Sequence, residues 1–189
     1  MLLSSDSDDR PNRTLLEEAQ KATRNSSGYH VEASGNTDTG SIVISGEIAG
    51  DNFDLTHVGQ SLRFRAVRGN YWKSSDNGST WSPTARDRGT YGLVNAPITR
   101  YAPPNSRVEV VEKENLTSGT LIWLQVRPDP APPHLVPRLP LPRFGVVQLR
   151  NGGTLLQRFK GAVLFLGVPV FMDITYSKIG VVDPIIAPQ

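Results

Sequence analysis

The chain has 189 residues, which suits one domain with a sizeable core, or one domain with short tails. Its 20 basic and 18 acidic residues leave a net charge of +2, so the overall charge does not favour a nucleic-acid partner. The absence of cysteine excludes disulfides, thiolate metal sites and cysteine nucleophiles. No stretch reaches the roughly 18 apolar residues that a transmembrane helix needs.

The first residues have the composition of a polar tether. Met1 to Leu3 run directly into a segment of serine and aspartate, without the apolar segment of a signal peptide. We therefore expect residues 1–12 to be flexible and residues 13–189 to form a single domain. Thr14 and Glu17 make a capping box, which predicts the start of a helix that ends at Gly28 and lies against a sheet.

From Tyr29 to Trp72 the apolar residues recur with a period of two, which predicts a series of short strands. Glycine or asparagine interrupts the pattern at short intervals, so neighbouring strands should be antiparallel. Residues 82–106 have no clear period and predict a loop or short helices that cover the sheet. Strands resume at 107–112 and 119–126, followed by a proline-dense segment over 128–142.

The C-terminal region predicts a hairpin and one long last strand. The hairpin joins residues 144–150 to 154–160, and the last strand extends from Ala162 to Tyr176. Residues 162–172 are apolar at nearly every position, so both faces of this strand must be covered. The cover could be core and helix, a hydrophobic ligand cavity, or a dimer or membrane-surface contact. Pro169 removes one ladder bond and indicates an edge or a bulge.

Residues 74–81 have the S-x-D-x-G-x-T-W pattern of an Asp-box, a motif familiar from sialidase propellers. A propeller needs several blades, whereas this chain has one box and no internal repeat of 20 to 50 residues. Sialidase chemistry also needs an arginine cluster with a tyrosine nucleophile and a glutamate, and no spacing in the chain nominates one. The pattern therefore favours a stabilised hairpin turn over a glycan-active enzyme.

No other motif indicates catalysis, a metal or a cofactor. The histidines, His30, His57 and His134, lie in separate segments without a second metal ligand at helical or hairpin spacing. His57 alternates with Leu55 and Phe53, so it is expected to point inward as a structural residue. Serine-hydrolase and phosphate-binding glycine motifs are absent from the sequence. The expectation is a protein that is not an enzyme and binds no cofactor.

Basic residues are concentrated in one part of the chain. From Arg127 to Lys160 there are six basic residues and one acidic residue, Asp129, which is a local excess of +5. This excess indicates either a solvated basic face or contact with anionic lipid headgroups.

The order of elements resembles the LolA-like and LppX/LprG-type lipoproteins of the bacterial envelope. The resemblance spans residues 14–81 and 107–188 in order. It is carried by the helix at 15–23, the following 27–35, the Tyr71-Trp72-Lys73 strand end, and the closing segments 172–178 and 182–188.

This resemblance implies an α+β fold in which a strongly curved antiparallel sheet of about ten strands, a half-barrel, has helix packed on its concave face. It also implies a hydrophobic cavity for acyl chains between sheet and helices, with no catalytic residues. If the apolar strand residues share one inward face, the cavity-lining residues are Ile42, Ile44, Phe53, Leu55, Leu62, Phe64, Trp72, Trp123, Leu164 and Leu166. The chain departs from the family in having few long amphipathic helices in its middle segment and no lipobox cysteine.

The favoured function is non-catalytic binding or transport of a lipid or other hydrophobic molecule at the bacterial cell envelope. The alternative is a structural or signal-sensing interaction module with a solid core. Partners are then a lipid or acylated molecule, with a membrane-surface contact or an envelope protein as further options and no nucleic acid. The expected location is exported, either anchored at the outer face of the envelope or periplasmic, with the signal and lipobox outside this sequence.

Overall fold

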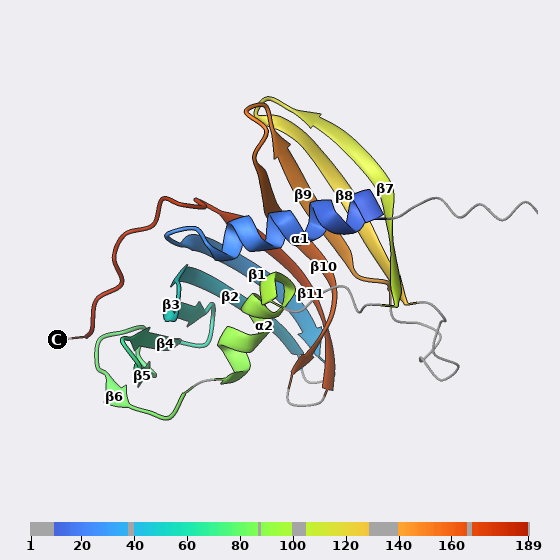
Figure 1. Cartoon of the computed structure of the whole chain (residues 1–189). Coiled ribbons are helices and arrows are strands. Elements are labelled where there is room, and N and C mark those ends of the chain that lie inside the picture. The colour runs from blue at the N-terminus through green and yellow to red at the C-terminus, as the bar shows by residue number, and fades with distance from the viewer. Residues whose placement is uncertain are drawn as a thin grey trace, which may run out of the picture.

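The computed structural model describes residues 10–37, 40–86, 88–99, 105–128, 140–165 and 168–188. In these residues, eleven strands form one strongly curved antiparallel sheet, and two helices lie on its concave side (Figure 1). The helices are α1 (Arg10–Arg24) and α2 (Arg88–Thr99). The strands are β1 (Tyr29–Thr37), β2 (Gly40–Ala49), β3 (Asn52–His57), β4 (Leu62–Val67), β5 (Asn70–Ser74), β6 (Ser82–Pro83), β7 (Ser106–Leu116), β8 (Gly119–Pro128), β9 (Arg143–Leu149), β10 (Thr154–Phe165) and β11 (Val168–Ser177). The predicted curved half-barrel of class α+β is confirmed.

The sheet consists of two meanders that meet in its middle. The strand order is β6-β5-β4-β3-β2-β1-β11-β10-β9-β8-β7, so β1 pairs with both β2 and β11. The two edge strands, β6 and β7, are not paired with each other, and the sheet stays open. Register shifts interrupt the β9–β10 and β7–β8 ladders, and such bulges bend strands.

The predicted single last strand is wrong, because residues 162–165 and 168–176 belong to two different strands. Residues up to Phe165 complete β10, and β11 starts at Val168 and returns beside it, with Val163 opposite Val170. The apolar run therefore comes from the two arms of a hairpin near their turn. At Pro169 the strand has β10 on one side only, since its ladder with β1 stops at Phe171. The proline therefore removes no hydrogen bond of the β1–β11 ladder, in agreement with the predicted edge position.

The first helix starts earlier than predicted. It begins at Arg10 rather than at the Thr14 cap, so part of the predicted tether is helical; residues 1–9 lie outside the described residues. Pro11 is tolerated there because the first turn of a helix has no use for its missing N–H. The side chains of Asn12 and Arg13 donate to the backbone carbonyls of Val108 and Ser106 on edge strand β7. These bonds attach the start of α1 to the edge of the sheet.

The two faces of the sheet differ in composition. We call the face under the helices the inner face and the opposite one the outer face. The inner face and the helices share one apolar core, whose largest buried side chains include Leu16, Leu93, Phe144, Phe159 and Tyr176. A separate, smaller cluster forms from Leu121, Trp123 and Val147, which alternate with core residues and therefore lie on the outer face.

Candidate functional site

Helix α2 covers the inner face of β3 and neighbouring strands. Tyr91 of α2 stacks on Phe53 of β3 with ring centroids 5.0 Å apart, and the helix buries Leu93, Val94 and Ile98 completely. Pro97 lies inside this twelve-residue helix, where it removes a backbone donor and weakens the helix. A short helix of this kind depends on its contacts with the rest of the protein for stability.

Polar contacts attach α2 to the helix and strands beneath it. From the sheet, the hydroxyls of Tyr29 and Tyr176 donate to Asn95 Oδ1 (2.8 Å) and to the Val94 carbonyl (2.9 Å), while His57 Nε2 lies 2.9 Å from the hydroxyl of Thr90. From α1, the buried amide of Gln20 donates to the Pro97 carbonyl at 2.7 Å. Burial raises the pKa of Tyr29 far above its usual value, so this phenol remains a hydrogen-bond donor. The predicted inward orientation of His57 is confirmed.

A cleft opens on the inner face at the start of α1. It has a volume of about 590 Å³ and lies between the first two turns of the helix and strands β7, β8 and β9. Its apolar lining includes Leu15, Val110 and Ile122, and its charged lining includes Arg10 and Lys113. The volume is within the range of about 300–1,000 Å³ that is typical of small-molecule sites. Asn12, Thr14, Glu18 and Gln148 also line the cleft, so its wall is part apolar and part polar, which matches the chemistry of an amphiphile.

The structure places six of the predicted cavity residues on the inner face near α2. Ile44, Phe53 and Leu55 are fully buried in the main core, and Ile42 and Phe64 are partly buried against it. Leu62 is partly buried and lies opposite His57 in the β3–β4 ladder. None of the six lines the cleft at α1. Five of the six, all except Leu62, thus belong to the packed core of the described structure.

The assumption of a common inward face is wrong for Trp72 and Trp123. Trp72 lies opposite Arg65, which alternates with core residues, so its ring is on the outer face. Trp123 likewise alternates with core residues along its strand, and it belongs to the outer cluster. Leu164 belongs to β10 and lies opposite Pro169, but the side chain of Leu164 is outside the described structure. Leu166 lies entirely outside the described residues.

The sequence analysis missed several inner-face residues. Tyr71, not Trp72, packs against the core, and a two-residue turn at Arg68–Gly69 sets this register. Both turn residues have positive φ, as the commonest hairpin turns require. Gly69 could therefore have predicted the position of the turn, and with it the register that directs Tyr71 inward. The lining residues Leu15, Val110 and Ile122 gave no comparable signal, because their grouping depends on how α1 crosses the curved sheet.

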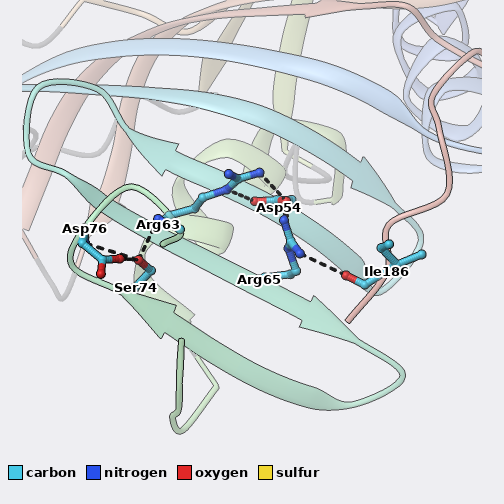
Figure 2. Close-up of polar contacts among 7 residues, drawn as sticks. Asp54, Arg63, Arg65, Ser74, Asp76 and Ile186 are labelled. Carbon is cyan, nitrogen blue, oxygen red and sulfur yellow. Dashed lines mark hydrogen bonds and ion pairs between the residues drawn. The ribbon is translucent and has the colours of Figure 1, made fainter. Parts of the chain in front are cut away.

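The outer face carries the Asp-box turn and an arginine cluster (Figure 2). Within the turn, Ser74 Oγ donates to Asp76 Oδ1 (2.6 Å), which also accepts from the Thr80 N–H at 2.9 Å. Nearby, Arg63 donates twice to Asp54 at 2.6 and 2.7 Å, and Arg65 donates to it at 2.8 Å. The bonds to Asp54 raise the pKa of Arg63.

This arginine cluster is engaged in structural contacts. The ring of Trp81 lies beside both guanidinium groups, with its centroid 4.7 Å from Arg65 Cζ and 5.8 Å from Arg63 Cζ. The tyrosines Tyr29, Tyr71, Tyr91 and Tyr176 all pack with the main core on the other face. Among the described residues, the arginines and carboxylate therefore do not converge with a tyrosine, and the glycan-active reading gains no support.

The described part of the chain shows neither a metal-binding group nor a membrane-spanning helix. It contains no group of three or more histidine, aspartate or glutamate side chains placed to hold a metal ion. Neither α1 nor α2 has the length and apolar character needed to cross a membrane.

Comparison with known proteins gives matches in structure but not in sequence. No protein-family model and no curated protein sequence matches the chain. The crystal structure of LprF from Mycobacterium bovis matches with a TM-score of 0.58 at 14% identity, covering 95% of this chain and 97% of LprF. The lipoprotein LppX from Mycobacterium tuberculosis matches with a TM-score of 0.57 at 14% identity, covering 94% of this chain and 99% of LppX. Over nearly its whole length, the chain has the LppX-type half-barrel fold.

Proposed function

We propose that this protein binds a lipid or another amphiphile on its inner face, without catalysis, at the bacterial cell envelope. The observation that carries the proposal is the cleft at the start of α1, whose apolar wall continues into the core beneath the helices. The LppX-type fold supports the envelope location in this proposal, since LppX is a lipoprotein. Burial of acyl chain would drive binding at about 0.8 kcal/mol per CH₂ group.

The entry route in this proposal runs from the cleft towards α2. The acyl chain enters beside Leu15, Val110 and Ile122 and extends along the inner face as α2 lifts from the strands. Such a movement would break the polar bonds of α2 to α1 and the sheet and expose Leu93, Val94 and Ile98, and the proline in its interior weakens the helix that has to move. The charged groups Arg10 and Lys113 remain at the cleft, where a headgroup would lie.

The proposal is tested by native mass spectrometry of gently purified protein, together with titration of a fluorescent fatty acid. Val110→Arg places a charge in the wall of the cleft, and we expect it to abolish co-purifying lipid and weaken probe binding at least tenfold. Val111→Arg is the matched control, because Val111 is almost equally exposed (40% against 38%) but does not line the cleft. Bare wild-type protein that also fails to bind the probe would refute the proposal.

A second function has one observation in its favour. Ile44, Phe53 and Leu55 are at most 2% exposed, so this part of the inner face is packed solid in the described structure. A solid core supports a structural or signal-sensing module that binds an envelope protein partner. The same experiment distinguishes the two functions. A sensing module would purify without lipid, and its Val110→Arg variant would behave like the Val111→Arg control.

A further inference from the structure

Four basic side chains form a row across the outer face, on four neighbouring strands. They are Arg107 on β7, Arg127 on β8, Arg143 on β9 and Lys160 on β10. Each follows or precedes a residue of the main core, so strand alternation directs all four to the outer face. We call this set the cationic row; three strand spacings of about 4.8 Å give it a width of roughly 14 Å.

The row contains two like-charge pairs at directly opposed positions. Arg107 lies opposite Arg127 in the β7–β8 ladder, and Arg143 lies opposite Lys160 in the β9–β10 ladder. Like charges directly opposite each other destabilise an antiparallel pair. The two pairs, on the β7–β8 and β9–β10 ladders, therefore have a cost in stability that the fold itself does not require.

Nearby carboxylates offset only part of this charge. Glu109 lies 3.7 Å from Arg127, and Asp173 lies 3.1 Å from Lys160 and 3.8 Å from Arg158, another basic residue of this face. Asp173 is thus shared by two cations. All three ion pairs are partly exposed, so water and salt weaken them. The remaining acidic residues of outer-face β7, Glu112 and Glu114, lie farther along the strand, opposite Trp123 and Leu121.

We propose that the cationic row is a docking surface for a membrane that carries anionic phospholipids. A planar array of phosphates needs no matching shape, and the row does not line the cleft at α1. A protein partner would need an apolar patch at the centre of its interface. The large apolar side chains of this part of the face, Leu121, Trp123 and Val147, are buried, so the surface it presents is charged.

This inference goes beyond the proposed lipid site and does not depend on it. The cleft and the cationic row lie on opposite faces of the sheet, so a variant at one should leave the other intact. Each basic residue near an anionic surface contributes about a fivefold gain in membrane affinity.

The test is sedimentation of the full chain with vesicles of pure phosphatidylcholine or of phosphatidylcholine with anionic phosphatidylglycerol. We expect binding to the anionic vesicles alone, and its loss when salt is raised from about 0.05 to about 0.5 M. Arg127→Gln combined with Arg143→Gln removes one member of each like-charge pair and should weaken binding about 25-fold. The same two positions changed to lysine keep the charge and should keep the binding.

The control is Arg150→Gln combined with Lys178→Gln, which makes the same change in net charge at exposed positions outside the row. We expect this control to bind the anionic vesicles within about twofold of wild type. In the variant with glutamine at Arg127 and Arg143, the relief of charge repulsion should keep the Tm at or above that of wild type. An equal loss in the control, or in the lysine variant, would overturn the proposal. Binding to poly-glutamate without binding to vesicles would also overturn it, in favour of an acidic protein partner.

Discussion

The hydrogen bond from Gln20 to the Pro97 carbonyl predicts how strongly α2 is held over the inner face. Gln20 is 6% exposed, and Gln20→Leu would keep most of its apolar contact while it removes the donor. A buried carbonyl that loses its partner costs about 1–3 kcal/mol. This cost falls on the closed state alone, because water solvates the carbonyl when α2 lifts. The opening equilibrium of α2 should therefore rise between about 5- and 150-fold.

Native-state hydrogen exchange measures this equilibrium directly through the amides of α2. Thr99→Ala is the matched control, since it removes an exposed hydroxyl that bonds Asn95 within the same helix, and it should change exchange little. The fluorescent fatty acid should enter Gln20→Leu faster than wild type if α2 is the gate. The reasoning is refuted if α2 exchanges as in wild type. It is refuted equally if every slow amide of the protein accelerates by the same factor, because the bond then stabilises the whole fold.

Three further predictions follow from the outer face. Trp123→Ala should lower the free energy of unfolding by about 3–5 kcal/mol, measured in urea, and leave lipid-probe affinity unchanged because the ring lies away from the inner face. Asp54→Asn should cost about 2 kcal/mol in the same assay, since it weakens charged hydrogen bonds from two partly exposed arginines; an unchanged midpoint would contradict this. Hydrogen bonds from Ser74 and Thr80 hold the pKa of Asp76 well below its usual 3.8, so the stability they add is present above that pH and is lost as pH falls towards the lower folded value. The difference in Tm between wild type and Asp76→Asn should accordingly stay constant from neutral pH down to about pH 5 and shrink below 3.8, as thermal melts across this range will show.

The sequence predicted the meander well where its signals are local. The strands between Tyr29 and Ser74 alternate with a period of two and are separated by glycine or asparagine turns, which fix antiparallel pairing without any long-range information. The α+β class and the curved sheet followed from this pattern together with the family resemblance. The division into a tether and a single domain over 13–189 remains a prediction.

The sequence-based predictions were wrong where two neighbouring residues give equally strong signals, or where contacts between distant segments determine the structure. Tyr71 and Trp72 are neighbouring aromatics, so composition alone cannot say which one points inward. Thr14 and Glu17 are a sound cap pattern, but bonds from the first turn of α1 to edge strand β7 extend the helix past them. The wall of the cleft joins residues more than ninety positions apart, and no local pattern encodes that proximity.

The pairing of β1 with β11 has a consequence for how the chain acquires its structure during synthesis. His30 and Ser177 are ladder partners near opposite ends of the sequence, in the middle of the sheet. The β2–β6 arm can form its hairpins as it leaves the ribosome, but β1 keeps one unpaired edge until β11 has been made. Until then that edge is exposed to wrong partners. A circular permutant that connects β11 to α1 through a linker and opens the chain in the β6–α2 connection would alter this order of events while leaving the finished sheet the same.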